Sequence, residues 1–135
     1  MEENKQLVRR FLYEVWNQKN IGIIDSVLSP TFCRHVPAAP YLLTRAKQKE
    51  WILEVQKALP DVALAVEDII AEGDMVAFRG QLRGTHSYRF LDVEPSGRQV
   101  LLLVVGFFRI EDDLIVEQWA GVSEFDLQQL LAVHI

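Results

Sequence analysis

The chain has one cysteine, Cys33, and it lacks any apolar run near the roughly 20 residues needed to cross a bilayer. A single cysteine excludes an internal disulfide and fits a reducing compartment. A lone cysteine between Phe32 and Arg34 is also more often a small buried apolar residue than a nucleophile. We therefore expect a cytoplasmic protein without a membrane partner.

Basic clusters are missing as well. The sequence has 14 Lys and Arg against 19 Asp and Glu, a net charge of -5, and its positive residues are scattered. Scattered positive residues on an acidic chain do not form a basic surface that could neutralise phosphates, so we expect no nucleic-acid partner. Half of the 135 residues are hydrophobic, which suffices for one core, and we interpret residues 1–135 as a single domain.

Familiar catalytic and metal motifs are also absent. There is no Gly-x-Ser-x-Gly nucleophile turn. The histidines His35, His86 and His134 form no pair at i and i+2 or i+4, which is the usual spacing of metal ligands. We expect no cofactor and no stoichiometric transition metal, and elemental analysis of the purified protein tests this.

Four segments have the apolar spacing of amphipathic helices. Three lie in the N-terminal half, at residues 3–17, at residues 21–28 before Ser29-Pro30, and from the capping residue Thr44 to Leu59. A shorter one follows at residues 124–133.

Strands are predicted at residues 32–36, 62–71, 75–85, 99–110 and 114–122, with Gly73-Asp74 and Asp113 in the turns. Helices followed by a meander of long strands predict an α+β domain. Its antiparallel sheet should be curved, with the three N-terminal helices on the concave face and the short helix at the C-terminus.

The strand at residues 100–108 is apolar at both parities, which predicts that both of its faces are dry. Helices can cover only the concave face. We expect a second copy of the chain to cover the outer face in a two-fold homodimer.

The strand that begins at Met75 places Val76, Phe78, Leu82 and His86 on one face. The apolar members predict that this face is inward. His86 would then enter the interior, where an imidazole can act as acid or base. The alternative is a histidine that a backbone carbonyl satisfies at the rim of the sheet.

In the last strand Glu117, Trp119, Gly121 and Ser123 share one parity, and Trp119 suggests that this parity is inward. Glu117 would then face the cavity, although a solvent-facing carboxylate near a turn is an equal alternative. Gly121 would leave room for a ligand or another backbone. Ser123 also fits a helix cap in the series Ser-Glu-Phe-Asp.

A longer ordered series of short motifs resembles the SnoaL-like polyketide cyclases along nearly the whole chain. The matching motifs are Trp16-Asn17, His35 with Pro37, Pro60-Asp61, Glu72-Gly73-Asp74-Met75-Val76, Gly84-Thr85-His86, Pro95-Ser96-Gly97-Arg98, Ile115-Val116-Glu117-Gln118-Trp119 and Gln128-Gln129-Leu130.

The resemblance implies the cone-shaped α+β barrel that this family shares with nuclear transport factor two, ketosteroid isomerases and scytalone dehydratases. It also implies metal-free aldol ring closure by an aspartate with histidine support. The supporting histidines fall on His35 and His86, whereas the position of the aspartate is occupied by Ser123.

The leading hypothesis is a pocket protein that acts on a small apolar carbonyl compound as a cofactor-independent cyclase, isomerase or hydrolase. His86 would be the principal acid or base, with His35 and Glu117 assisting. We expect His86→Ala to abolish turnover with little change in melting temperature.

The ligand would be held by Phe78, Phe107, Trp119 and Ser123. The alternative is a non-catalytic module of the same fold that binds a ligand or dimerises.

Overall fold

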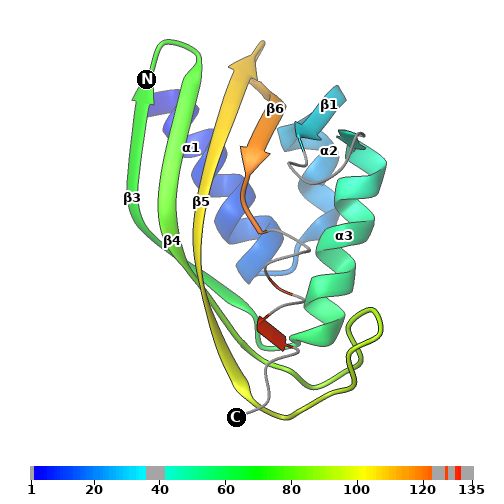
Figure 1. Ribbon diagram of the computed structural model, residues 1–135. Helices are drawn as coiled ribbons and strands as arrows, with labels where there is room; N and C mark the ends of the chain where they lie inside the picture. The colour runs from blue at the N-terminus through cyan, green and yellow to red at the C-terminus, as the bar shows by residue number, and fades with distance from the viewer. Residues whose placement is uncertain (1, 36–41, 123–126, 128–129, 132–135) are drawn as a thin grey trace.

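Six strands form one sheet in the order β2-β1-β6-β5-β4-β3. The structure is a computed structural model that describes residues 2–35, 42–122, 127, 130 and 131. The strands are β1 (Leu28–His35), β2 (Leu42–Thr44), β3 (Ala63–Glu72), β4 (Met75–Thr85), β5 (Gln99–Glu111) and β6 (Leu114–Ala120). Strands β3, β4 and β5 bend along their length, and α1 and α3 lie within the bend (Figure 1).

The predicted α+β class is confirmed, and so are the three helices predicted in the N-terminal half. The first helical segment is α1 (Glu2–Arg10), which continues as the π-helix η1 (Phe11–Asn17). The second consists of the 3₁₀-helix η2 (Ile21–Ile23) and α2 (Ile24–Val27). The third is α3 (Arg45–Ala58), and the side chain of Thr44 caps it by accepting a hydrogen bond from the Lys47 amide. Most of the predicted C-terminal helix lies outside the described residues.

The sheet is mixed rather than wholly antiparallel. Strand β1 runs parallel to β6, with Cys33 opposite Glu117 and His35 opposite Trp119, whereas the other pairs are antiparallel. A parallel pair needs a long crossover between its strands. Here most of the chain lies between β1 and β6. The two strands are therefore far apart in sequence, and their order along the chain did not indicate that they pair.

Apolar side chains fill the concave side. Helix α3 contributes Trp51, Ile52 and Val55, all at 6 % exposure or less, and burying each stabilises the fold by about 1.5–3 kcal/mol. From the sheet, Phe78 stacks on Phe108 at 6.0 Å between ring centroids.

The space beside Phe78 is also occupied. A Cβ at Gly106 would lie 2.6 Å from the Phe78 ring. The interior is therefore closely packed around Phe78.

The face prediction for β4 is correct, because Val76, Phe78 and Leu82 are buried and Arg79 and Arg83 are exposed. The face prediction for β6 is wrong. Residues 109 and 110 of β5 pair with Glu117 and Ile115, so Val116 is an extra residue, a β-bulge, in β6. The bulge leaves Ile115 inward but reverses the faces of every later residue of the strand.

Candidate functional site

His86 lies on the inner side of the sheet, directly after β4, and none of its surface is exposed. Its ring nitrogen Nδ1 accepts from the Ser96 amide at 3.4 Å and lies 3.3 Å from the Ser96 hydroxyl. Because a backbone amide can only donate, the neutral ring carries its proton on Nε2. Nε2 is buried and has no hydrogen-bond partner among the described residues.

A buried donor without a partner costs about 1–3 kcal/mol, so such an atom is a candidate contact for a ligand. Burial lowers the pKa of His86 from its usual 6.5, and the positive charge of Arg98 lowers it further, against an opposing contribution from the Tyr88 backbone. His86 is therefore a neutral imidazole at physiological pH. The prediction that it faces inward is confirmed.

A buried polar network occupies another part of the concave face. Arg34 donates to the Val122 carbonyl at 2.6 Å and to Gln48 Oε1 at 3.5 Å. Gln48 Nε2 donates to Gln118 Oε1 at 3.3 Å, and Trp51 Nε1 donates to the Val122 carbonyl at 3.2 Å. These contacts tie β1, α3 and the end of β6 together.

Sequence reasoning missed Arg34, Gln48 and Gln118. Gln48 precedes Trp51 and Ile52 by three and four residues on the buried stripe of α3, so helical periodicity could have identified it. Gln118 could not be found in this way, since it faces inward only because of the bulge at Val116.

The other predicted site residues lie elsewhere. Glu117 and Trp119 are on the outer face of the sheet, and His35 joins them there rather than facing His86. The His35 ring stacks on Trp119 at 4.9 Å between centroids and 5° between planes. Phe107 is also outside, with 47 % of its surface exposed. Strand register explains this placement, because β5 and β1 position Phe107 and His35 directly beside Trp119.

The chamber expected between Phe78, Phe107 and Trp119 does not form, because Phe78 is inside the sheet and the other two are outside. The room expected at Gly121 is also taken, since a Cβ there would lie 2.4 Å from the amide of Gln118. Ser123 lies outside the described residues. A surface hollow of about 420 Å³ at the ends of β4 and β5 is lined by Asp61, Arg83, Gly84, Thr85, Gln99, Val100 and Leu101, and His86 is not part of it.

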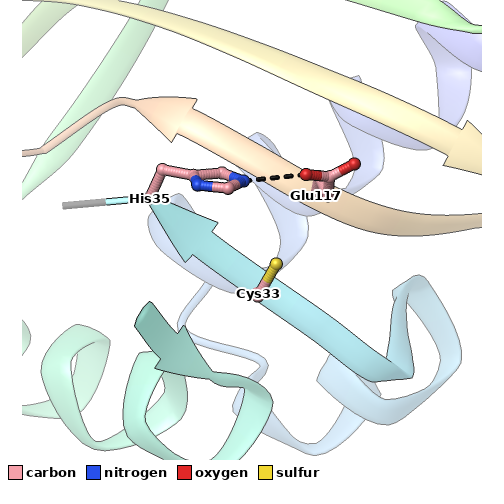
Figure 2. Close-up of side chains that lie close together, drawn as sticks. All are labelled: Cys33, His35 and Glu117. Atoms are coloured by element: carbon pink, nitrogen blue, oxygen red, sulfur yellow. Dashed lines mark hydrogen bonds and ion pairs between the residues drawn. The ribbon is translucent and has the colours of Figure 1, made fainter. Parts of the chain in front are cut away.

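Glu117 is the centre of an ion-pair cluster on the outer face. Its Oε2 lies 2.7 Å from His35 Nε2 and its Oε1 accepts from Arg109 Nε at 2.6 Å. These hydrogen bonds, first that of His35 and then that of Arg109, lower the pKa of Glu117 from 4.5. Figure 2 shows that Cys33 lies on the adjacent strand with its sulfur toward this pair. Burial and the charge of Glu117 raise the pKa of the Cys33 thiol.

Comparison with known proteins agrees with the fold and with the ordered motifs. The family model for the SnoaL-like polyketide cyclases matches residues 6–132. The chain belongs to the SnoaL-like polyketide cyclase family. Among curated proteins none matches the sequence. Within the described residues no helix is both long and apolar enough to span a membrane.

Solved structures support the assignment of this SnoaL-like chain. AclR of Streptomyces galilaeus, a proposed hydroxylase, is 29% identical over 97% of this chain and 96% of its own, with a TM-score of 0.84. IdmH of Streptomyces antibioticus, a proposed polyketide cyclase, is 27% identical over 96% and 99%, with a TM-score of 0.80. A proposed SnoaL-like cyclase of Jannaschia sp. CCS1 shares the fold, with 20% identity over 99% and 94% and a TM-score of 0.86.

The buried neutral state of His86 predicts how stability varies with pH. The unfolded chain binds a proton at about pH 6.5, whereas the folded chain resists protonation until a lower pH, so the unfolded state holds more protons in between. The free energy of unfolding should be highest above about pH 6.5 and should fall as the pH falls through the folded pKa. Urea denaturation at several pH values between about 5 and 7.5 measures this slope.

His86→Gln should flatten that slope, whatever its effect on absolute stability. Asp61 and Glu117 also have lowered pKa values, from 3.8 and 4.5, but their contributions are lost only in more acidic solution. An equal slope in the wild type and in His86→Gln would show that the imidazole is not buried in its neutral form.

Proposed function

We propose that this SnoaL-like protein acts in the cytoplasm on a small apolar carbonyl compound, without a cofactor, as a cyclase, isomerase or hydrolase whose acid–base group is His86. The observation that carries the proposal is the buried Nε2 of His86, which has no partner among the described residues. The relatives proposed to be a cyclase and a hydroxylase, both of matching length, support an organic substrate.

The geometry defines the role of His86. The Nε2–H of the neutral ring can donate a hydrogen bond to a carbonyl oxygen and stabilise the negative charge that develops there as a neighbouring carbon loses its proton to water. The imidazole itself then carries no buried charge in the resting protein. Because the ring has no exposed surface, a ligand reaches it only when packed neighbouring side chains move aside. His35 and Glu117 lie on the other face of the sheet, so we no longer assign them an assisting role.

Binding without turnover is the second candidate, and one observation favours it. The buried polar residues of the described chain are Ser29, Arg34, Gln48, Gln56, His86 and Gln118, with no carboxylate among them. A carboxylate is the base that the family resemblance implies, and Ser123 stands at its position. The Nε2–H of His86 would then only donate a hydrogen bond to the carbonyl oxygen of a bound ligand, without transferring its proton.

Exchange of carbon-bound hydrogen next to a carbonyl tests the catalytic proposal. Wild-type protein is incubated in D2O with a panel of aryl ketones, β-diketones and methyl esters, and deuterium uptake is measured by mass spectrometry. We expect His86→Gln to slow the exchange of an accepted compound by about 10²–10⁴-fold, the usual contribution of a general acid or base.

His35→Gln is the matched control and should exchange at the wild-type rate, since His35 lies on the outer face. Equal losses in both variants would contradict the assignment to His86. Binding of a panel member to the wild type without any exchange would establish the non-catalytic module instead.

We also propose that the outer face of β5 is covered by a second copy of the chain. The side chains of Leu101, Leu103, Val105 and Phe107 are 48 %, 75 %, 52 % and 47 % exposed in a single row. Ion-paired charges border this row. Arg79 of β4, beside Val105, is bound to Glu67 and Asp68, and Arg109, which follows Phe107 at the end of the row on β5, is bound to Glu117. An apolar centre with a charged border is typical of a protein–protein interface.

Leu103→Asp should convert the dimer to a monomer in light scattering at low micromolar concentration, because a carboxylate without a partner is costly inside an interface. Leu53→Asp is the control, since Leu53 is a 44 % exposed leucine of α3 and not of the sheet. A monomeric wild-type protein, or dimers of equal stability in all three proteins, would contradict the proposed interface.

A further inference from the structure

Three potential metal ligands of different chemistry converge on the outer face of the sheet. Cys33 and His35 are two residues apart on β1 and point to the same side, and β1 pairs with β6 so that Cys33 lies opposite Glu117. The Cys33 sulfur, a ring nitrogen of His35 and a carboxylate oxygen of Glu117 all lie within 4.8 Å of one another. Figure 2 shows the three side chains gathered between the two strands.

Neighbouring residues hold two of these ligands in position. The His35 ring lies flat against Trp119, with planes only 5° apart, which limits its rotation. Glu117 uses its Oε1 to accept from Arg109 Nε at 2.6 Å, so its Oε2 is directed at His35 Nε2. Metal sites rely on such supporting contacts to orient the ligands themselves.

We propose that Cys33, His35 and Glu117 bind one divalent metal ion of the zinc type. Thiolate, imidazole and carboxylate are all ligands of Zn²⁺, and three protein ligands with a water molecule complete a tetrahedral site. The ion would take the place of the hydrogen bond between His35 and Glu117 and of the thiol proton. All three ligands come from one chain, so the site does not require a second copy.

Local charge supports this assignment. A thiolate and a carboxylate together balance the two positive charges of the ion, and the imidazole is bound in its neutral form. Arg109 is the nearby cation, and it is shared with Glu111, whose carboxylate lies 3.0 Å from Nη1. The ion therefore does not face an uncompensated positive charge.

A thiol nucleophile of the cysteine–histidine–carboxylate type fits this geometry less well. In such a triad the nucleophile and the carboxylate contact opposite nitrogens of the imidazole ring. Here Glu117 already holds Nε2, and the sulfur of Cys33 points to the gap between that nitrogen and the carboxylate (Figure 2). Three donors that face one point are arranged for a shared ion.

The proposal replaces the expectation, drawn from histidine spacing, that the protein holds no metal. Histidine spacing takes no account of Cys33 and His35, which stand at i and i+2 and which a strand places on one face. Glu117 joins them only through the pairing of β1 with β6. The site lies on the opposite side of the sheet from His86, so the test of metal binding is independent of the proposed function.

Cobalt substitution provides the test. The reduced full-length protein is freed of metal with a chelator and titrated with Co²⁺, whose absorption reports both geometry and sulfur ligation. We expect one Co²⁺ per chain, the intense visible bands of a tetrahedral ion, a near-ultraviolet thiolate-to-cobalt band, and loss of all these bands when Zn²⁺ is added.

Cys33→Ser, which is nearly isosteric, should abolish the thiolate band. His35→Gln and Glu117→Gln should each weaken Co²⁺ binding by at least about tenfold, since even supporting residues are worth about 10–100-fold. Glu111→Gln is the matched control: it also removes a partner of Arg109 on the same face, but it supplies no ligand, and it should keep the wild-type spectrum.

Absence of the thiolate band in the wild type would overturn the proposal, as would its survival in Cys33→Ser. An equal loss of affinity in Glu111→Gln and Glu117→Gln would also overturn it, because the effect would then reflect the general charge of this face.

Discussion

One additional residue in β6, Val116, determines which side chains enter the core and which face outward. It leaves Ile110 of β5 paired with Ile115 but Arg109 paired with Glu117. Without it, Glu117 and Trp119 would share the inner face with Ile115, and a carboxylate would lie unpaired among apolar side chains at a cost of several kcal/mol. With it, Gln118 faces inward, where Gln48 and the Ala120 carbonyl satisfy its amide.

The bulge therefore separates two kinds of chemistry on the two sides of one sheet. The inner side has a neutral imidazole and an amide and guanidinium network tied to backbone carbonyls. The outer side has the ionised groups of Glu117 and Arg109 with the sulfur of Cys33 and the ring of His35. Glu117 and Arg109 keep partial access to water and are paired with each other, so they can be charged although burial alone would disfavour it, whereas burial holds His86 neutral.

The sequence predicted the three N-terminal helices, five of the six strands and the face of β4, because long helices and regular strands follow from local periodicity. It did not predict the short strand β2. His86 was placed correctly for this reason, since β4 runs without a bulge from Met75 to Thr85 in its pairing with β5. The turn at Asp113 was also predicted correctly, with φ of 61°.

The site residues of β1 and β6 were misplaced, for two physical reasons. A bulge depends on the register of two strands distant in sequence, and no single strand reveals it. The parallel pairing of β1 with β6 joins residues more than 80 positions apart, as in the contact between His35 and Glu117. Such long-range pairing decides which polar residues meet, and it is the part of the site that local patterns do not contain.

The most direct test of this account is the nuclear Overhauser pattern of the Trp119 indole in the protein in solution. Stacking on the outer face predicts strong cross-peaks between the indole protons and the ring protons of His35. Cross-peaks from the indole to inner-face residues such as Val104 and Phe108, with none to His35, would show that β6 has no bulge at Val116 and would contradict the separation of the two faces.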